Sequence, residues 1–209
     1  MQLSATVLII IITALSSFYA WKNYSFLSRS MFNPYLVNER GQYDRFVLSG
    51  FIHKDGMHLL FNMITFYFFG RLVEQYLTYR FGGMVGIVVF VAFYLAAIVI
   101  ADIPTYLKHK NNPHYQALGA SGGTSAAVFA SIILMPMADI CLFGLLCLPG
   151  FILGILFLGY SAIKSKQGND SINHDAHLYG ALFGIGFILV LSPESAVHFI
   201  DQVKNFSLF

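Results

Sequence analysis

Long apolar segments separated by short polar ones run along the whole chain. A helix that crosses a bilayer needs about 20 mainly apolar residues, so stretches poor in acidic and basic side chains indicate candidate spans. Six are predicted, at residues 3–20, 57–79, 81–101, 118–135, 140–163 and 176–191. The second contains Arg71 and Glu74 near its end, and the sixth stops before Ser192-Pro193. This pattern predicts an all-α, polytopic membrane protein.

The first apolar segment has a rival interpretation as a cleaved signal peptide. A signal peptide begins with a basic region that precedes its apolar stretch. Here the first positive side chain is Lys22, which follows the apolar run. We therefore expect residues 3–20 to remain in the protein as a membrane span.

Composition agrees with a bilayer environment and excludes other classes. Of 209 residues, 57% are hydrophobic and only 11% are charged, against about a quarter charged in ordinary soluble domains. Disordered, collagen-like, coiled-coil and disulfide-scaffold proteins have different compositions. The net charge of +2 predicts no nucleic-acid partner. Cys141 and Cys147 lie in an apolar run and are interpreted as buried, small apolar residues that say nothing about redox compartment.

The segment between the first two spans differs from an ordinary solvated linker. Residues 22–56 are rich in Tyr and Phe, and Trp21 directly precedes them. Aromatic side chains prefer the interface between membrane and water, so we expect this first loop to be structured and membrane-associated. Neither repeats nor a break in composition divide the chain, and a single domain over residues 1–209 is predicted.

Polar residues lie inside or at the start of three predicted spans, where they are costly and indicate function by default. His58 and Asn62 are four residues apart, which puts both on one helix face. Ser121 and His177 lie at the starts of the fourth and sixth spans. Each residue alone has a structural explanation, such as an interfacial histidine or an asparagine that bonds between helices. Their occurrence together, at similar depth, favours a shared site.

These four residues supply the parts that acyl transfer requires. Serine becomes a nucleophile when a base takes its proton, which assigns Ser121 as nucleophile and His177 as base. Side-chain N–H groups of His58 and Asn62, with the backbone N–H of Ser121, are candidates for stabilising the oxyanion. No metal and no organic cofactor is needed for this chemistry.

Glycines accompany the candidate site. Gly119 and Gly122 flank Ser121 and leave room for a substrate backbone. Gly180 and Gly184 follow His177 at the spacing that lets membrane helices approach closely. We expect the sixth helix to pack directly against the fourth.

At this point the chain resembles the rhomboid family of intramembrane serine proteases, over most of its length from about Tyr43 to Gly186. The resemblance rests on three motifs that occur in the family's order: His58-x-x-x-Asn62, Gly119-Ala-Ser121-Gly122 and Ala176-His177-x-x-Gly180-x-x-x-Gly184.

The resemblance implies a six-transmembrane-helix rhomboid bundle that cleaves single-pass transmembrane proteins. It implies a Ser121–His177 dyad without an acidic third member, with His58 and Asn62 as oxyanion donors. It also implies structural roles for three further residues, namely His53 and Arg45 in the first loop and Glu74 at the cytoplasmic end of the second helix.

Two positions depart from the family's pattern. Asp44-Arg45 stands where the familiar pattern has Trp-Arg. Ser125 stands where many relatives place an aromatic ring that stacks on the catalytic histidine, so the orientation of His177 has less support. Phe129, one turn later, is a candidate substitute.

A soluble hydrolase is one alternative reading of the same residues. The glycines around Ser121 also match a nucleophile elbow, and Asp170 or Asp175 followed by His177 would complete its chain order. That motif needs a preceding strand and alternating strands and helices. The long apolar segments at 81–101 and 140–163 predict helices instead.

Other membrane activities lack their residues. Zinc intramembrane proteases need His-Glu-x-x-His, which the sequence does not contain. Aspartyl chemistry needs two carboxylates within spans, whereas Asp102 and Asp139 lie at span ends. A transporter would be expected to carry a charged residue in mid-span. The serious alternative is a catalytically silent rhomboid-like protein that binds membrane clients.

The predicted orientation contains a conflict. Loops one, three and five hold nine of the twelve Lys and Arg residues, and the positive-inside rule would place them in the cytoplasm. The resemblance implies the reverse, with the active site opening outside and both termini in the cytoplasm of a bacterial plasma membrane. We follow the resemblance because its motifs are specific. Neither the natural substrate nor the oligomeric state is indicated by the sequence.

Overall fold

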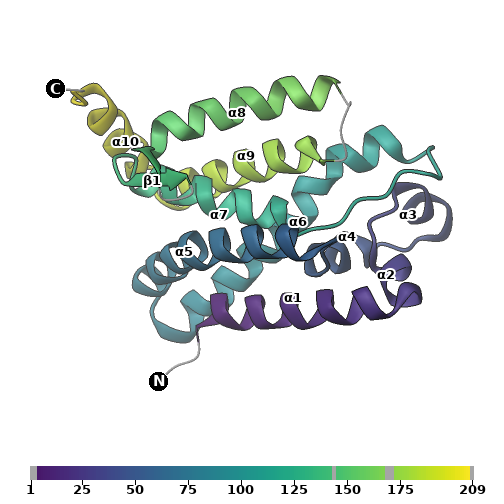
Figure 1. Ribbon diagram of the computed structural model, residues 1–209. Coiled ribbons are helices and arrows are strands. Elements are labelled where there is room, and N and C mark those ends of the chain that lie inside the picture. Colours follow the sequence, from purple (N-terminus) through teal and green to yellow (C-terminus); the bar gives the residue numbers. More distant parts are fainter. Residues whose placement is uncertain (1–3, 143–144, 168–171, 208–209) are drawn as a thin grey trace.

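The computed structural model describes residues 4–142, 145–167 and 172–207 (Figure 1). Helices dominate these residues. The elements in chain order are α1 (Ala5–Lys22), α2 (Tyr24–Ser30), α3 (Pro34–Arg40), α4 (Arg45–Leu48), a 3-10 turn (Ser49–Phe51), α5 (Gly56–Phe81), α6 (Gly83–His109), α7 (Ser121–Leu134), β1 (Asp139–Leu142), β2 (Leu146–Pro149), α8 (Gly150–Gln167), α9 (His174–Leu191) and α10 (Glu194–Lys204).

Membrane crossing is supported for part of the bundle. Among the described residues, α1, α6 and α9 are long and apolar enough to cross a bilayer. Helix α5 has 26 residues but carries Arg71, Glu74 and Arg80 in its second half. Helix α7 has only 14 residues and rises about 21 Å, less than the roughly 30 Å hydrocarbon core. Six spans therefore stay a prediction.

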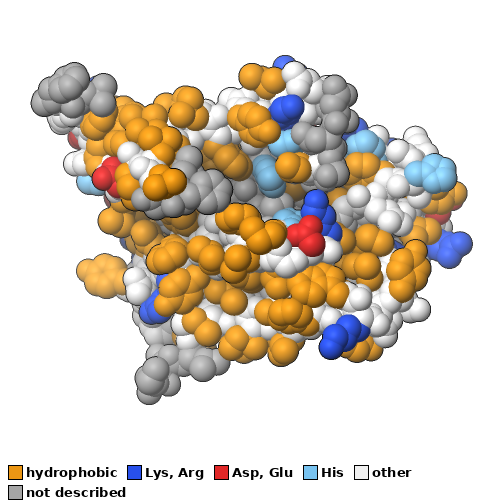
Figure 2. Space-filling model, in the orientation of Figure 1, with side chains coloured by type: hydrophobic (Ala, Val, Ile, Leu, Met, Phe, Trp, Pro, Cys, Tyr) orange, Lys and Arg blue, Asp and Glu red, His pale blue; other side chains and the backbone are white. Residues whose placement is uncertain are grey.

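The outer surface of the bundle is apolar, as expected for a membrane protein. Large apolar side chains such as Leu15 on α1, Phe68 on α5 and Ile155 on α8 are each more than half exposed. Such side chains cover much of the face formed by these helices (Figure 2). In lipid this exposure carries little penalty, because the acyl chains are themselves apolar.

The predicted fifth span, residues 140–163, is wrong before residue 150. Residues Asp139–Leu142 and Leu146–Pro149 form an antiparallel hairpin, and helix α8 begins only at Gly150. Proline lacks a backbone N–H and disfavours helix at the residue before it, so Pro149 ends any helix that approaches from its N-terminal side. An apolar run alone does not distinguish strand from helix.

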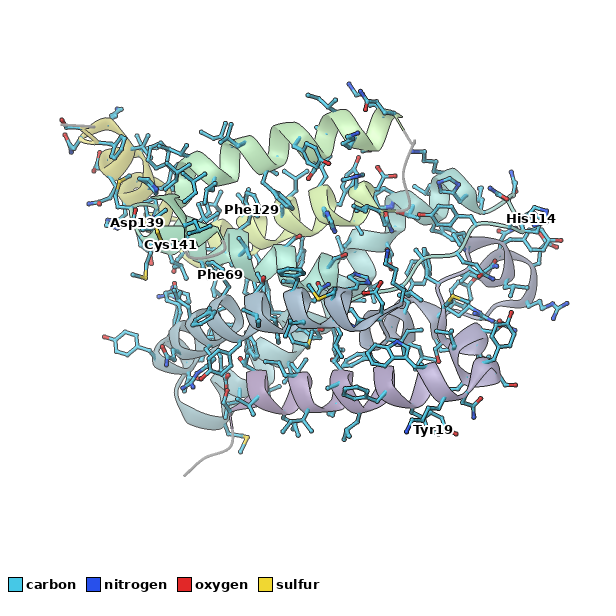
Figure 3. The ribbon with its side chains drawn as sticks, viewed as in Figure 1. Tyr19, Phe69, His114, Phe129, Asp139 and Cys141 are labelled. Atoms are coloured by element: carbon cyan, nitrogen blue, oxygen red, sulfur yellow. A yellow bond between two sulfur atoms is a disulfide. The ribbon has the colours of Figure 1, made fainter. Side chains whose placement is uncertain are left out.

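The interpretation of the two cysteines as buried, small apolar residues is also wrong. Cys141 and Cys147 are cross-strand partners in the hairpin and form a disulfide. Both residues are exposed. The hairpin lies at the end of the bundle that holds α10 and the start of α1 (Figure 1), and Cys141 lies far from His114 at the opposite end (Figure 3).

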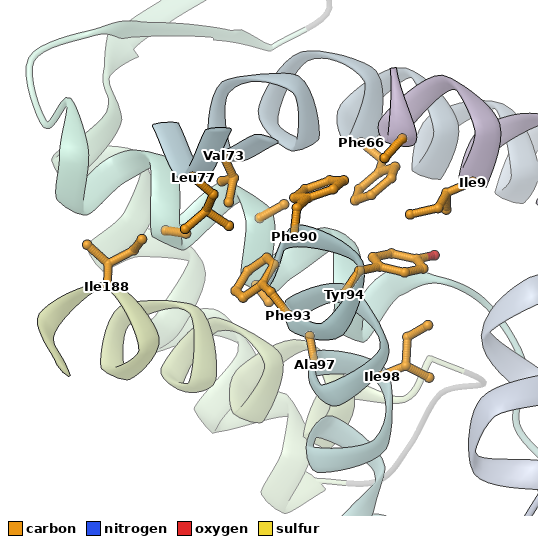
Figure 4. Close-up of a cluster of buried hydrophobic side chains, with 14 of the residues drawn as sticks. Ile9, Phe66, Val73, Leu77, Phe90, Phe93, Tyr94, Ala97, Ile98 and Ile188 are labelled. Atoms are coloured by element: carbon orange, nitrogen blue, oxygen red, sulfur yellow. The ribbon is translucent and has the colours of Figure 1, made fainter. Parts of the chain in front are cut away.

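The core is built around α6, which contacts α5, α7 and α9. Aromatic side chains of α5 and α6 interlock there, with Phe66, Phe90 and Tyr94 all completely buried (Figure 4). Helix α7 contributes small residues, so its neighbours can approach its backbone closely. Because apolar transfer drives little association within lipid, this dense packing is itself a main source of cohesion.

The first loop is structured, as predicted. Residues 23–51 fold into α2, α3, α4 and the 3-10 turn. Arg45 is buried, and its guanidinium donates to the backbone carbonyls of Ser28 and Met31 and to the side chain of Gln42. Phe32 pairs by two backbone hydrogen bonds with Ala117, which joins this loop to the segment that precedes α7.

Candidate active site

Ser121 is the first residue of α7 and is half-buried. Helix α7 begins in the middle of the bundle and runs toward the hairpin (Figure 1). The preceding segment, residues 110–120, carries the chain back to this point without helix. Irregular backbone at membrane depth is tolerated where it is covered by protein or lines a cavity. Ser121 therefore lies inside the bundle, at some depth from the end that the first loop covers.

Gly119 holds the backbone before Ser121 against the imidazole of His58. Its φ of +125° belongs to a region that residues with a side chain rarely adopt. A Cβ atom at Gly119 would lie 2.6 Å from Cε1 and 2.9 Å from Nε2 of His58. Glycine is therefore required here twice, by the backbone conformation and by contact with His58.

The start of α5 places His58 and Asn62. Asp55 caps this helix, since its Oδ1 accepts from the backbone N–H of His58 at 2.8 Å. That bond holds the pKa of the exposed Asp55 carboxyl below its usual range. Asn62 donates one amide hydrogen to the His58 carbonyl at 2.9 Å. An amide nitrogen has two hydrogens, so the second stays available to a ligand.

His53 holds the backbone of Ala120, the residue before Ser121, by a hydrogen bond. Its Nε2 accepts from the backbone N–H of Ala120 at 3.2 Å, and its Nδ1 lies 3.2 Å from the Ser17 hydroxyl. Its carbonyl accepts from the indole of Trp21 at 2.7 Å. Complete burial of the ring, with the neighbouring His58 as a lesser cause, lowers the pKa of His53 to about 3. The ring is therefore neutral, as the accepting role of Nε2 requires.

The lowered pKa of His53 makes stability depend on pH. Unfolded His53 binds a proton near pH 6.5, whereas folded His53 does so only near pH 3. Its contribution is thus complete above pH 6.5 and is lost as pH falls toward 3. We expect His53→Gln to flatten unfolding stability against pH between 7 and 4, by up to about 1.4 kcal/mol per pH unit. Thermal unfolding in detergent measures this, and the exposed His114→Gln is the control. Parallel curves for wild type and His53→Gln would contradict it.

His177 lies in the first turn of α9, which Asn173 caps. The His177 ring stacks on Phe157 of α8, with centroids 5.9 Å apart and planes inclined by 29°. Phe129 packs against Phe157 at 5.7 Å. The aromatic support that Ser125 does not offer thus comes from α8, with Phe129 behind it. No pattern in the sequence could have selected Phe157 from the apolar run that contains it.

Glycines bring α7 and α9 into backbone contact beside the candidate dyad. A Cβ at Gly180 would lie 2.3 Å from the Gly122 carbonyl oxygen, and one at Gly184 would lie 2.1 Å from that of Ala126. No larger residue fits either position without moving a helix. Gly122 follows Ser121 directly and lies near Ala176, which directly precedes His177. The structure therefore brings the start of α7 and the first turn of α9 together.

A small cavity lies at this junction. Its volume is about 20 Å3, room for about one water molecule. Ser121, Gly122, Ala176, Asn173 and Asp102 are among its lining residues. Histidine side chains are visible at the surface between α8 and α5 (Figure 2).

Two other candidate residues make structural contacts. Glu74 is near the opposite end of α5, where its carboxylate accepts from the backbone N–H groups of Ala5 and Thr6 and from the hydroxyls of Ser4 and Thr6. Glu74 thereby caps the start of α1. Asp175 pairs with Lys108 at 3.5 Å, whereas Asp170 lies outside the described residues. Among the residues that the structure describes, no cluster of His, Cys, Asp and Glu could hold a metal ion.

Comparison with known proteins places these residues in a family. The model of the Rhomboid domain matches residues 40–194. RHOMBOID-like protein 12, mitochondrial, of Arabidopsis thaliana is 29% identical over 189 residues, which cover 84% of this chain and 55% of the relative. Presenilin-associated rhomboid-like protein A, mitochondrial, of Danio rerio is 30% identical over 77% of this chain and 42% of its own length. Rhomboid-like protein 11, chloroplastic, of Arabidopsis thaliana is 25% identical over 87% of this chain and 64% of its own length.

The chain spans about half the length of the curated relatives it matches. The match to the Rhomboid domain begins at the end of α3. It includes α4, all three motifs and the helices that carry them. This chain belongs to the rhomboid family.

Proposed function

We propose that this chain is an intramembrane serine endopeptidase that cleaves single-pass transmembrane proteins within or beside their membrane helix. One observation carries the proposal. Ser121 and the helical turn that bears His177 line one small polar cavity inside an apolar bundle, and the imidazole of His58 contacts Gly119, another of its lining residues. A water-poor site of this kind strengthens the hydrogen bonds on which acyl transfer depends.

In the proposed reaction, Ser121 Oγ attacks the carbonyl carbon of the scissile peptide bond. His177 takes the hydroxyl proton and returns it to the leaving amine, which yields an acyl-enzyme. His177 then activates a water molecule that hydrolyses the ester. Stacking on Phe157 restricts the His177 ring, and this restraint substitutes for the orienting acid of a three-residue triad.

Oxyanion stabilisation is assigned to the backbone N–H of Ser121 and to the side chains of His58 and Asn62. The backbone N–H of Ser121 lies at a helix start, where N–H groups have no partner within the helix. His58 contacts Gly119, and its buried Nδ1 has no hydrogen-bond partner among the described residues. A buried, unpaired ring nitrogen is costly. We interpret the unpaired nitrogen of His58 as a group that becomes hydrogen-bonded when a ligand is present.

Asn62 is expected to contribute to the oxyanion through its second amide hydrogen. Asn62→Ala removes that donor while keeping the helix, since alanine is a strong helix former. We expect the rate of cleavage to fall about 10- to 1,000-fold, with little change in the thermal unfolding midpoint. Asn62→Asp is the matched variant, which keeps the shape but lacks the N–H, and should be no faster. An Asn62→Ala variant with the wild-type rate would remove Asn62 from the mechanism.

The alternative is a rhomboid-like protein that binds membrane clients without cleaving them. Purified protein in liposomes, mixed with a panel of single-pass membrane proteins, separates the two functions. A protease converts at least one of them into two fragments, and Ser121→Ala does not. Stable co-purification of a client with no fragment from any panel member would favour the binding role. The natural substrate is expected to contain a helix that unwinds locally, because an intact helix hides its peptide carbonyls.

The proposal includes the orientation implied by the rhomboid resemblance, with the first loop outside and both termini in the cytoplasm of a bacterial plasma membrane. Two features oppose it: the positive charge of the outer loops and the Cys141–Cys147 disulfide at the inner end. Part of that positive charge has a structural role, since Arg45 is buried and Lys108 pairs with Asp175.

The redox state of the cysteine pair tests this orientation. In the proposed orientation the hairpin faces the cytoplasm, where thiols are kept reduced. The disulfide should then be open in cells, and N-ethylmaleimide should alkylate both cysteines when cells are lysed in its presence. Mass spectrometry then reports on this cysteine pair alone, because the chain contains only two cysteines. Cysteines that resist alkylation until a reductant is added would place the hairpin in an oxidising compartment and reverse the proposed orientation.

A further inference from the structure

Asp102 is a buried carboxylate that the proposed chemistry does not use. It lies in α6 and is 8% exposed. Its Oδ1 accepts from Nδ2 of Asn173 at 3.2 Å, and none of the ion pairs among the described residues involves it. An ionisable side chain in a membrane helix is expensive and indicates function by default. Asp102 also lines the cavity that reaches Ser121.

Asn173 connects Asp102 to the helix that carries His177. Its Oδ1 accepts from the backbone N–H of Ala176 at 3.1 Å, which caps α9, and from the Thr105 hydroxyl at 3.0 Å. Its backbone carbonyl accepts from the N–H of His177 at 3.3 Å. Because Asp102 Oδ1 accepts from this amide, the Asn173 nitrogen faces Asp102. The Asn173 oxygen must then face the helix.

The same part of α6 also touches the helix of Ser121. A Cβ on Gly122 would lie 2.6 Å from the Cβ of Ala101, and Ala101 directly precedes Asp102. One turn of α6 therefore contacts the residue after Ser121 through packing, and the turn before His177 through Asn173. It is placed to set the two catalytic helix starts relative to each other.

We propose that Asp102 is a positioning residue, which fixes the orientation of Asn173 and thereby the approach of His177 to Ser121. The inference rests on the proposed protease function. A displacement of about 1 Å at a reacting group lowers rates about 100-fold, so a bond that holds one helix start in place affects the reaction without touching substrate.

The exchange of the two side chains tests the proposal. In Asp102→Ala, the Asn173 nitrogen loses its acceptor, and the Asn173 amide can rotate so that its oxygen no longer caps α9. We expect the second-order rate of fluorophosphonate labelling at Ser121 to fall about 10- to 100-fold. The double variant Asp102→Asn with Asn173→Asp restores one amide–carboxylate bond and places aspartate, a preferred cap, at the start of α9. We expect it to recover most of the wild-type rate.

Controls separate this inference from general loss of stability and from the proposed function. Ser131→Ala removes a buried hydroxyl bond at the far end of α7 and should lower stability without slowing labelling. If the Asp102→Ala variant is labelled as fast as the wild type, the positioning role is overturned and the proposed protease function is unaffected. A double variant that recovers neither folding nor labelling also overturns it. Absence of labelling in folded wild type refutes the protease itself.

Discussion

Ser121→Ala and His177→Ala should each abolish proteolysis while leaving a folded protein. The first removes the nucleophile and the second removes the base, and residues that act as one unit each account for nearly the whole chemical effect. We expect turnover of a single-pass substrate in liposomes to fall by at least about 10⁴-fold in either variant. Fragment formation on gels, quantified against time, measures this loss.

Ser125→Ala is the matched control, since Ser125 lies one turn further along α7 and is buried. It should retain turnover within about threefold, because buried hydroxyls outside the site contribute mainly to packing. Undiminished cleavage by a purified Ser121→Ala variant would refute the mechanism. Loss of activity in Ser125→Ala equal to that in Ser121→Ala would show that the assay reports folding.

The second large effect is expected at the contact of α9 with α7. Gly180→Ala introduces a methyl group 2.3 Å from the Gly122 carbonyl oxygen, where two backbones leave no flexible side chain to yield. The helices must separate, which moves His177 away from Ser121 and removes packing that the bundle needs. We expect at least a 100-fold loss of turnover together with a lower thermal unfolding midpoint.

Gly186→Ala is the control for helix propensity in the same helix. A Cβ at Gly186 meets nothing within 4 Å, and alanine is favoured over glycine in a helix by about 1 kcal/mol. We expect unchanged turnover and an equal or higher unfolding midpoint. Similar loss in both variants would mean that α9 is sensitive to any substitution and that the contact with Gly122 has no special role.

The residues of the candidate site were accessible from the sequence, because their chemistry is unusual for their surroundings. Ser121, His177, His58 and Asn62 are polar in apolar segments, and their spacing to glycine predicted that helices would meet there. The backbone contact at Gly180 and the clash that would follow from a side chain at Gly119 required the structure. Sequence reports that glycine is present but not which atoms surround it.

The sequence was less informative where composition does not determine conformation. Residues 140–149 are mostly apolar and were predicted as helix, although Asp139–Leu142 and Leu146–Pro149 are the strands of a hairpin. Helix α7 is shorter than its apolar segment because Leu118 and Gly119 belong to the irregular segment before it. Phe157 and Asn173 act through tertiary contacts, and no local pattern distinguishes them from neighbouring residues of the same kind.

Covalent labelling of purified protein with a fluorophosphonate probe tests the central claim most directly, because it requires an activated serine but no knowledge of the substrate. The account predicts one adduct per chain, mapped by mass spectrometry to the peptide that contains Ser121. The adduct should be absent from Ser121→Ala and strongly slowed in His177→Ala. A folded protein that acquires no adduct, or acquires it at a serine other than Ser121, would contradict the account.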